Sequence, residues 1–488
     1  MLFNSLEFAV FLPIAFLLYW FVFQKNIGLQ NFFLIAISYL FYGWWDWRFL
    51  SLIVFSSIVD FFIGIRLGRE EIASKRKILL GISLAVNLGL LGFFKYYNFF
   101  IESFVDAFSF FGAKFSPYTL QIILPVGISF YTFQTLSYSI DVYRKKLEPT
   151  RDWKSFFAYV SFFPQLVAGP IERATNLLPQ FYKKREFNEE KATDGMRQIL
   201  WGFFKKIVIA DSCAVGVNEI FANSADYSGW TLLLGGVLFA FQIYGDFSGY
   251  SDIAIGTARL FGFNLMQNFA FPYFSRDIAE FWRRWHISLS TWFRDYLYIP
   301  LGGSRGGTSM KVRNTFAIFL VSGFWHGANW TFLAWGLINA LYFLPLLLTK
   351  RNRKNLDVAG GNKFFPSLKE VFQILTTFFI TVVAWIFFRA ESISHAFDYI
   401  AEMFSGLLNI ETLFSTMTYI SSSLGWTSLF FIGILLLVEW LQRTKQHALE
   451  LTGLPLARFT RWGIYTSVVL SIIIFGTYDG GQFIYFQF

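Results

Sequence analysis

The stretch "NTFAIFLVSGFWHGANWTFLAWGLINALYFLPLLLTK" (residues 314–350) contains no charged residue before its final lysine. An apolar run of this kind is typical of a chain that enters a lipid bilayer. His326 lies inside it, in a protein with only 4 histidines. A polar ring at membrane depth is energetically costly, so His326 indicates either a hydrogen bond between helices or a functional site.

The apolar run has basic residues on both sides, which places its two ends on the same face of a membrane under the positive-inside rule. Returning to that face by two full crossings takes about 40 residues, whereas Thr315 to Leu348 supplies 34. We therefore expect a broken or re-entrant element that turns back at Gly327. About twelve helical residues from Thr315 rise about 17 Å, which places His326 near the middle of the bilayer, facing a cavity. A single long tilted span is the alternative, and it requires one basic cluster to lie on the opposite face.

The composition of the whole chain indicates a polytopic helical membrane protein. Of 488 residues, 55% are apolar and 15% are charged, whereas soluble domains carry about 25% charged residues. We predict an all-α fold with about 11 transmembrane helices, together with re-entrant or amphipathic cytoplasmic helices, around a central tunnel. The candidate spans lie near residues 6–24, 30–48, 50–66, 78–98, 119–142, 155–169, 198–220, 230–262, 315–348, 368–389, 426–441 and 463–477.

No internal repeat or soluble segment divides the chain, so we predict a single membrane domain over residues 1–488. Within it, N-terminal spans occupy 1–118, a central core occupies 119–348, and C-terminal spans occupy 368–488. The first apolar run, Phe8 to Phe23, lacks the basic flank and the cleavage site of a signal peptide, so we expect it to be retained as a span.

The sequence contains no pattern that predicts a metal site or a disulfide bond. Cys213 is the single cysteine, which excludes an intrachain disulfide and a cysteine-based metal cluster. No HExxH motif and no carboxylate cluster has the spacing of a metal site. We therefore predict no metal and no permanently bound cofactor.

The net charge of +9 comes from Lys and Arg clustered in short loops between apolar runs. This pattern is typical of topology control and of attraction to anionic lipid headgroups, and no nucleic-acid-binding motif accompanies it. Placing the basic loops in the cytoplasm predicts a multi-pass protein with both termini outside. The four loops contain Arg66, Arg69, Lys75, Arg76 and Lys77; Arg144, Lys145, Lys146, Arg151 and Lys154; Lys350, Arg351, Arg353 and Lys354; and Arg443, Lys445, Arg458 and Arg461.

The sequence also predicts where several other polar residues lie in such a membrane protein. Residues 171–196 are mixed in charge and are expected to form a partly amphipathic cytoplasmic segment. Lys205 and Lys206 fall inside the following apolar run, so we expect them to snorkel to the surface or to face a wet cavity. His395 and His447 lie at polar, loop-like positions and are expected at the surface. The other two histidines therefore remain as candidates for chemistry.

The second of these, His286, lies in "EFWRRWHISLS", within the most polar block of the chain (residues 276–313). A neutral imidazole in a wet cavity is a competent general base, so His326 and His286 are the candidate catalytic residues. Ser322 precedes His326 by four residues, where a continuous helix places both on one face, and a Ser–His pair is an alternative. Further candidates for substrate or donor binding are Arg283, Arg284, Arg294, Arg305, Asn329 and Ser322.

Both histidine blocks resemble the membrane-bound O-acyltransferase family, in the bacterial branch that acetylates polysaccharides such as alginate. The blocks are "FWRRWHISLSTWFRDYLYIPLGG" (281–303) and "GFWHGANWTFLAWG" (323–336). Supporting matches are "SFYTFQTLSYSIDVYR" (129–144), "FFPQLVAGPIER" (162–173), "FQIYGDFSGYSDIAIG" (241–256) and the terminal "FIYFQF" (483–488). They extend from the fifth candidate span to the last residue.

The resemblance implies that His326 is the family's catalytic histidine and His286 its second signature histidine. It implies a helical ring that thins at its centre into a tunnel between cytoplasm and exterior. The implied donor is an acyl thioester such as acetyl-CoA, and the implied acceptor is an exported polysaccharide or peptidoglycan. It also implies a partner on the outer face with a Ser-His-Asp (SGNH-type) hydrolase-like fold that completes the transfer to sugar hydroxyls.

Basic residues of the cytoplasmic block suit such a donor, because arginine binds phosphate groups through charge-assisted hydrogen bonds. Arg283, Arg284, Arg294, Arg305 and Lys311 are candidates to attract coenzyme A, and topology control explains the same charges equally well. The Gly-rich "PLGGSRGG" (300–307) lacks the spacing of a phosphate-binding loop and is expected to form a turn.

Three other functions remain open at this point. Within the family, D-alanyl transfer toward teichoic acid would use a carrier-protein thioester, and a lipid acyltransferase would need a lateral opening of lipid size. From another class, a transporter or channel with a structural histidine would carry a solute and would need no acyl donor.

Overall fold

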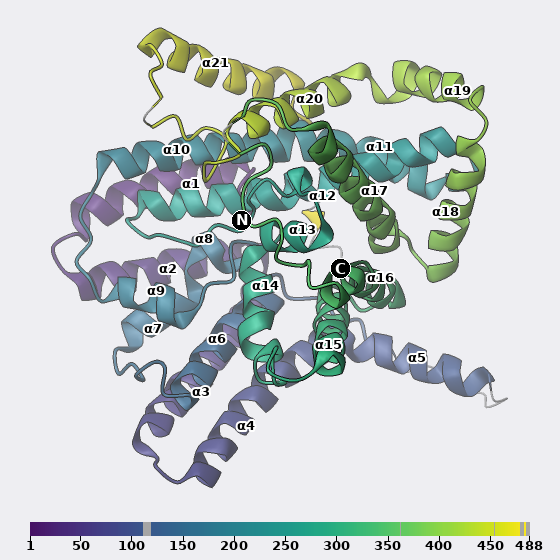
Figure 1. Ribbon diagram of the computed structural model, residues 1–488. Coiled ribbons are helices and arrows are strands. Elements are labelled where there is room, and N and C mark those ends of the chain that lie inside the picture. Colours follow the sequence, from purple (N-terminus) through teal and green to yellow (C-terminus); the bar gives the residue numbers. More distant parts are fainter. Residues whose placement is uncertain (111–118, 362, 453, 479–482, 485–488) are drawn as a thin grey trace. The chain divides into compact units, whose positions relative to one another are not determined.

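The computed structural model describes residues 1–110, 119–361, 363–452, 454–478 and 483–484. All regular elements of these residues are helices (Figure 1). The last four residues of the terminal "FIYFQF" lie outside the described residues. The chain divides into two compact units, residues 1–192 with 257–266 and residues 193–256 with 267–488. Whether they form the single membrane domain expected from hydropathy stays a prediction.

The first unit is built from helices, and polar residues begin several of them. Asn26 begins α2 by accepting a hydrogen bond from the backbone N–H of Leu29, and Asp152 begins α7 in the same way, through Lys154. Side-chain oxygens at this position satisfy backbone donors that a helix leaves unpaired. The helices are α1 (Leu6–Leu17), α2 (Ile27–Asp46), α3 (Leu50–Arg69), α4 (Ala73–Leu91), α5 (Tyr97–Phe110), α6 (Ile128–Tyr143), α7 (Trp153–Ser161), α8 (Phe163–Leu166) and α9 (Ala174–Phe181).

A buried carboxylate joins three of these helices. Asp60 of α3 accepts hydrogen bonds at Oδ1 from the hydroxyls of Ser83 (2.5 Å) and Ser139 (2.7 Å). Its Oδ2 accepts a 2.7 Å hydrogen bond from Nδ2 of Asn87. A carboxylate inside an apolar helix is tolerated when neighbouring helices supply donors in this way. The polar side chains of α4 and α6 therefore help to specify how α3, α4 and α6 pack.

The apolar run at 155–169 does not form the single span predicted for it. It is divided between α7, which ends at Ser161, and the short α8. The N–H of Phe163 donates to the hydroxyl of Ser38 instead of continuing α7. The following amphipathic segment is present as expected, because α9 buries Ala174, Leu177, Leu178 and Phe181 on one face. This spacing is that of an amphipathic helix.

The second unit contains the two histidine blocks. Long helices alternate with short ones and with π-helical turns, which occur often at functional sites. Its elements are α10 (Glu189–Phe203), η4 (Phe204–Ala210), α11 (Asp211–Ala222), α12 (Gly229–Leu260), α13 (Ile278–Arg284), α14 (Ile287–Phe293), η7 (Arg294–Tyr298), α15 (Thr308–His326), α16 (Trp330–Leu348), α17 (Leu368–Arg389), α18 (Ile393–Leu407), α19 (Thr412–Tyr419), α20 (Trp426–Leu441) and α21 (Arg458–Phe475).

Fewer helices than expected satisfy the length and composition of a membrane span. Among the described residues there are 5, or up to 6 if a pair bent by 96° within residues 412–441 counts as one span. The 43-residue run Ile27–Arg69 is about twice the length of one crossing and contains the predicted spans 30–48 and 50–66. The remaining qualifying helices are Ala73–Ser109, Gly229–Leu260, Trp330–Leu348 and Leu368–Arg389.

Residues 314–350 lie in a helical hairpin, which rules out a single long span. α15 ends at His326, Gly327 is extended, and α16 begins at Trp330 (Figure 1). The break at Gly327 is therefore confirmed. α15 begins at Thr308, seven residues earlier than the apolar run suggests, so each limb has 19 residues. A helix of this length rises about 28 Å.

Close backbone packing holds the two limbs together. A Cβ atom at Gly323 would lie 2.2 Å from the carbonyl oxygen of Phe332, and one at Gly327 would lie 2.0 Å from the Phe332 ring. Real Cβ atoms do not approach other atoms so closely, so both positions require glycine. Small residues at such contacts are typical of packed membrane helices.

Two expectations about buried charges are wrong. Lys205 and Lys206 neither snorkel nor face water: each is 3% exposed. Lys205 pairs with Asp252 at 2.5 Å, and Lys206 pairs with Asp211 at 2.8 Å and Asp246 at 2.7 Å. The carboxylates of Asp246 and Asp252 come from α12, some forty residues further along the chain, so sequence proximity did not reveal the pairing. Buried charges are stable only when paired in this way.

His447 is also buried rather than at the surface, at 2% exposure. Its Nε2 lies 3.1 Å from Oδ1 of Asp194, a residue more than 250 positions earlier. His395 is only partly exposed, and its Nε2 lies 3.4 Å from the hydroxyl of Ser224. A polar neighbourhood in the sequence therefore did not predict exposure for His447, because its partner is distant in the chain.

Candidate functional site

A cavity of about 490 Å³ in the second unit brings both candidate histidines together. Its walls come from α13, α14, η7, α15, α16 and the 349–361 loop that follows α16. About half of the lining residues are aromatic or aliphatic, and the others are polar or charged. The lining residues are Ala279, Trp282, Arg283, Trp285, His286, Leu289, Ser290, Phe293, Arg294, Tyr298, Ser304, Thr315, Ile318, Phe319, Ser322, His326, Phe343, Leu347, Asn352, Arg353 and Leu356.

His326 lies at the last residue of α15 and is 4% exposed. Its ring is enclosed by aromatic rings, with centroid distances of 5.0 Å to Trp325, 5.2 Å to Trp335 and 5.3 Å to Phe388. The hairpin sets its position, because the helix stops at Gly327 and the second limb supplies Trp335. The aromatic wall leaves the imidazole in an environment with little water, so few water molecules compete with it for a proton.

His286 reaches the same cavity from a very different backbone. It separates α13 from α14 with φ 44° and ψ 54°, in the left-handed region. A non-glycine residue rarely adopts this conformation, and such strain is concentrated at functional sites. Its ring meets Phe247 at 4.6 Å and Trp325 at 6.1 Å. Trp325 contacts both histidine rings and therefore connects the two blocks.

Hydrogen bonds determine the tautomer of His286. Oδ1 of Asn268 accepts from the backbone N–H of Ser288 (3.3 Å) and from the Ser288 hydroxyl (2.8 Å). Nδ1 of His286 lies 3.1 Å from the same oxygen and must donate to it. The amide nitrogen of Asn268 donates to the hydroxyl of Ser251 at 3.0 Å, which holds the amide in this orientation. Nε2 is then an acceptor, and it has no hydrogen-bond partner among the described residues.

Burial keeps His286 neutral. The ring is 1% exposed, and desolvation lowers its pKa to about 3. A neutral imidazole with a free Nε2 lone pair can accept a hydrogen bond from a bound molecule. His286 therefore has the protonation state that an orienting acceptor requires.

The predicted donor-binding arginines fall into two groups. Arg283 and Arg294 line the cavity, whereas Arg284 and Arg305 do not. Arg283 donates to the carbonyl oxygens of Asn352 (2.8 Å) and Asn355 (2.5 Å) in the 349–361 loop. Arg294 pairs with Asp295 at 2.7 Å and is largely exposed.

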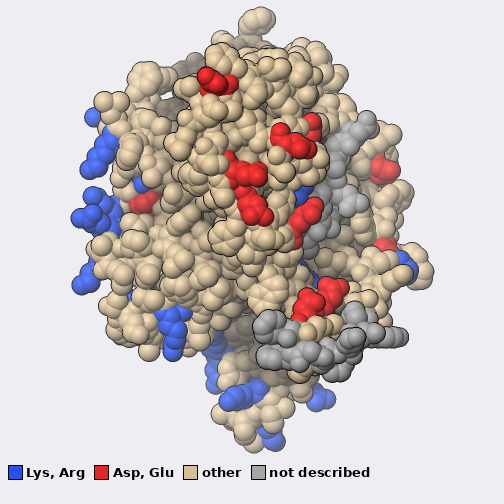
Figure 2. Space-filling view, turned by 90° about the vertical axis from the view of Figure 1, so that its right-hand side faces the viewer, with Lys and Arg blue, Asp and Glu red and all other residues tan. Residues whose placement is uncertain are grey.

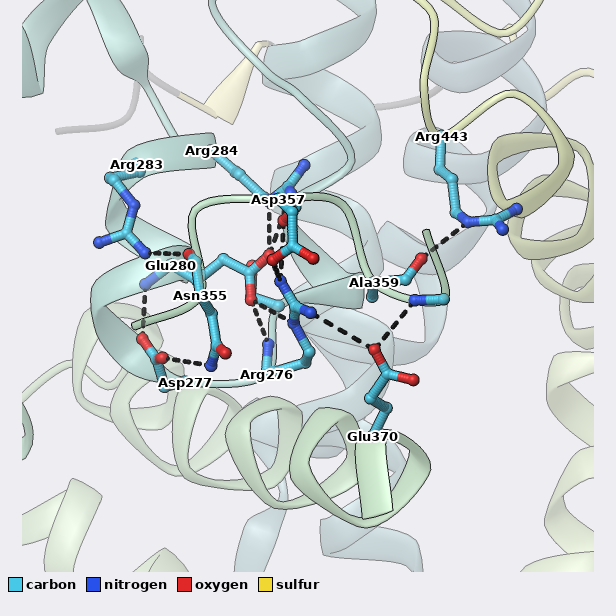
Figure 3. A network of polar contacts seen from close by, with 12 residues as sticks. Arg276, Asp277, Glu280, Arg283, Arg284, Asn355, Asp357, Ala359, Glu370 and Arg443 are labelled. Carbon is cyan, nitrogen blue, oxygen red and sulfur yellow. Dashed lines mark hydrogen bonds and ion pairs between the residues drawn. The ribbon is translucent and has the colours of Figure 1, made fainter. Parts of the chain in front are cut away.

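The same loop is held by a cluster of charges centred on Arg276 (Figure 3). Arg276 is paired with Glu280 at 3.0 Å, Asp357 at 2.9 Å and Glu370 at 3.3 Å. Arg284 pairs with Glu280 at 3.0 Å and also donates to the carbonyl oxygen of Asp357. The guanidinium of Arg276 lowers the pKa of the Asp357 carboxyl group. Arg284 therefore anchors the loop that borders the cavity.

The other predicted residues occupy distinct places. Ser322 lines the cavity one turn before His326 on α15. Asn329 does not line it: its side chain accepts from the N–H of Thr331 and donates to the carbonyl of Glu391 (3.2 Å), so it begins α16. The Gly-rich segment 300–307 forms turns, as expected. No group of three or more His, Cys, Asp or Glu side chains in the described part of the chain is arranged to hold a metal ion.

Sequence reasoning missed two residues of the site. Asn268 orients His286 but lies eighteen positions away, in a segment without regular structure. Arg353 lines the cavity with an exposed side chain, whereas the sequence placed it only among the basic loops of the cytoplasmic face. The spacing of basic residues after a membrane helix carries no signal that separates a cavity-lining arginine from its neighbours.

Comparison with known proteins agrees with this geometry. A model of the membrane-bound O-acyltransferase family matches residues 151–388, which include both histidine blocks. The chain is 40% identical over 412 residues to a probable alginate O-acetylase of Pseudomonas aeruginosa, covering 83% of this chain and 75% of the relative. It is 35% identical over 425 residues to the peptidoglycan O-acetyltransferase of Helicobacter pylori, covering 81% and 78%. Similarity to the teichoic acid D-alanyltransferase of Bacillus subtilis is lower, at 26% over 290 residues, covering 56% and 71%. The chain thus belongs to the membrane-bound O-acyltransferase family and is an acyltransferase integral to the membrane.

Proposed function

We propose that this acyltransferase moves an acetyl group from a cytoplasmic thioester donor to hydroxyl groups of an exported polysaccharide or of peptidoglycan. The observation that carries the proposal is that His286 and His326, forty residues apart, line one cavity. The relatives at 40% and 35% identity are a probable alginate O-acetylase and a peptidoglycan O-acetyltransferase. The D-alanyltransferase is more distant, at 26%, so acetyl transfer is the favoured chemistry.

The reaction requires a base beside the acceptor and a site for the thioester carbonyl. In the proposed step, the acceptor hydroxyl oxygen attacks the carbonyl carbon while the imidazole of His326 takes the hydroxyl proton. The new C–O bond forms, the C–S bond breaks, and the proton passes to the departing thiolate. His286, neutral and with Nε2 free to accept, orients a donor or acceptor group in the same cavity. The aromatic wall excludes water that would hydrolyse the thioester.

The donor is proposed to be acetyl-CoA, which meets the cavity at its basic border. Arg353 and Arg294 are exposed there and can approach phosphate oxygens. Arg283 supports this border indirectly, by holding the carbonyls of Asn352 and Asn355. Arg284 and Arg305 do not line the cavity, so a direct contact with a donor phosphate is proposed for Arg353 and Arg294 in preference to them.

The wider architecture follows from the sequence and stays a proposal. It comprises about 11 spans in the cytoplasmic membrane of a bacterium, both termini outside, a tunnel through the centre, and an SGNH-hydrolase-like partner on the outer face. A cysteine at Ser74, in a Cys213→Ser background, tests the orientation. We expect an impermeant thiol reagent to leave it unlabelled in intact cells and to label it in inside-out vesicles. Labelling of intact cells would show that the orientation is inverted.

The function is tested by ester analysis of the cell envelope in strains with and without the gene. Loss of acetyl esters on deletion, restored by the wild-type gene and not by a His326→Ala gene, is the expected result. Unchanged acetyl esters with loss of D-alanyl esters would support the alternative donor instead. An unchanged envelope together with full acetyl-CoA hydrolysis or transfer by the purified protein would point to a different acceptor.

A further inference from the structure

A second cavity lies in the first unit, at the turn between α3 and α4. It has a volume of about 380 Å³ and is lined by Arg66, Arg69, Glu70, Lys75, Ile78 and Leu79. Three of these six side chains are cationic, and the two aliphatic ones come from the first turns of α4. The acyl-transfer chemistry proposed above makes no use of this cavity. The sequence predicted for its basic residues only topology control and a general attraction to anionic headgroups, without a defined site.

A buried arginine shapes this cavity. Arg76 is 7% exposed and donates to the carbonyl oxygens of Leu67 and Glu70 at the end of α3. Its other nitrogen donates to the carbonyls of Val142 (3.2 Å) and Tyr143 (2.8 Å) at the end of α6. Arg76 thus bonds to backbone acceptors at the ends of two helices. The turn that carries the lining cations is therefore held in a defined shape.

The lining cations themselves are available to a ligand. The side chains of Arg66, Arg69 and Lys75 are exposed and form no ion pair among the described residues. Glu70, the acid in the lining, accepts a hydrogen bond from the backbone N–H of Ile72 at 3.0 Å. Its carboxylate is thus engaged by its own turn. The cavity consequently presents a net positive charge to the outside.

Further cations lie beside the cavity. The bonds from Arg76 bring the end of α6 to this turn, and Lys145 and Lys146 follow there with exposed side chains. Figure 2 shows Lys and Arg side chains at the surface, along its left edge and around its lower end. A cluster of cations at the end of membrane helices attracts anionic lipid headgroups.

The apolar wall of the cavity continues along an exposed helix face. Only 17% of the most apolar window of residues 73–109 is buried. Ile78 is 63% exposed, Ile82 46% and Leu88 47%. In a membrane this face meets acyl chains. A ligand with an anionic head and two acyl chains would place its head among the cations and its chains along α4, which a soluble anion does not do.

We propose that the cavity lined by Arg66, Arg69 and Lys75 binds the headgroup of an anionic phospholipid, with the acyl chains along α4. A basic loop that acts only during membrane insertion needs no shaped cavity and no arginine bonded to two helix ends. Each cation near an anionic membrane strengthens attraction roughly fivefold at low salt. The three lining cations together are expected to give a preference of roughly tenfold or more for anionic over zwitterionic lipid.

The test measures lipid binding by the full-length protein in a neutral detergent. Mixed micelles containing dioleoylphosphatidylglycerol or dioleoylphosphatidylcholine are titrated, and retained lipid is counted by native mass spectrometry. The test variant combines Arg66→Gln, Arg69→Gln and Lys75→Gln. The control combines Lys183→Gln, Lys184→Gln and Lys191→Gln, which removes the same charge from exposed positions of the same unit.

The wild type and the control should prefer phosphatidylglycerol roughly tenfold or more, and the test variant less than about twofold. Three results overturn the proposal: no preference in the wild type, an undiminished preference in the test variant, or an equal loss in the control. Inorganic phosphate at about 10 mM and constant ionic strength is then added as a competitor. Displacement of phosphatidylglycerol by this phosphate would also overturn the proposal, because it would indicate a site for soluble anions. Because the absence of a preference in the wild type overturns the proposal by itself, the proposal remains falsifiable even if the triple variant fails to fold.

Discussion

His326 and His286 line one cavity, yet the structure holds them by opposite means. His326 lies at the end of a 19-residue helix, and its position depends on backbone packing at Gly323 and Gly327 and on surrounding aromatic rings. His286 lies between two seven-residue helices in a strained conformation, and its orientation depends on hydrogen bonds to Asn268. One histidine is placed by shape and the other by polar contacts.

This difference separates the two roles. A residue enclosed by rings on a long hairpin is suited to a reaction that needs one fixed atom and little water. A residue oriented by an amide network is suited to accept a hydrogen bond in one defined direction. We therefore expect His326 to act on the reacting atoms and His286 to orient a bound group.

Replacing His326 with alanine should reduce acetyl transfer by about a thousandfold, because a general base typically contributes 10²–10⁴. The variant should still fold, since the hairpin is held by backbone contacts that the substitution leaves in place. Activity per folded protein, with monodispersity checked by size exclusion, is the measurement. More than a tenth of wild-type activity in a folded variant would remove His326 from the chemical step.

Replacing His286 with alanine should reduce activity by roughly tenfold to a hundredfold, a smaller loss than for His326. The expected cause is loss of an acceptor at Nε2, so His286→Gln, which keeps an acceptor, should recover part of the activity. Steady-state kinetics of both variants make the comparison. Equal losses for His286→Ala and His326→Ala would show that the two rings act as one unit.

Asn268 should act only through His286. Asn268→Leu removes the acceptor that holds Nδ1–H and should reduce kcat by roughly tenfold, while Asn268→Asp keeps an acceptor oxygen and should be milder. The distinguishing measurement is the double variant with His286→Ala. Additive losses would contradict the assignment, because a positioning residue has nothing left to position once His286 is absent.

Substitutions at the border of the cavity should distinguish arginines that contact the donor from arginines that support the loop. Arg353→Gln should raise the KM for acetyl-CoA a few-fold, because its exposed guanidinium makes a solvent-screened contact. Arg305→Gln, with an exposed side chain outside the cavity, is the matched control and should leave KM unchanged. Arg283→Gln should lower kcat more than it raises KM, since it loosens the 349–361 loop. An unchanged KM for Arg353→Gln and Arg294→Gln at normal yield would favour a carrier-protein donor.

The smallest effect concerns stability and pH. The pKa of His286 is lowered to about 3 in the folded protein, whereas the unfolded value is near 6.5. As pH falls, the unfolded state therefore takes up a proton at His286 before the folded state does. The contribution of this residue to the free energy of unfolding is thus fully present above about pH 6.5 and is lost progressively between about pH 6.5 and 3. His286→Gln should show a shallower fall in the thermal midpoint between pH 6.5 and 4.5. An identical slope for wild type and variant would show that His286 is not buried as a neutral ring.

Local patterns were sufficient for several features of this protein. The apolar run with His326 and a glycine break predicted a helix that turns back, and α15 and α16 do so at Gly327. The polar block at residues 276–313 contains His286, which the sequence marked as a candidate, and its role in catalysis stays a prediction. These features depend on neighbours along the chain, so hydropathy, helix geometry and the conformational freedom of glycine were enough to predict them.

Only the tertiary structure decided how distant polar groups are paired. Lys205 and Lys206 meet carboxylates of α12, His447 meets Asp194, and His286 takes its tautomer from Asn268. It also decided that Arg283 binds loop carbonyls while Arg353 lines the cavity, although both are arginines in basic segments. A charge or an imidazole is stabilised by whichever partner the fold brings within about 3 Å, and for Lys205, His286 and His447 that partner lies on another segment, tens to hundreds of residues away.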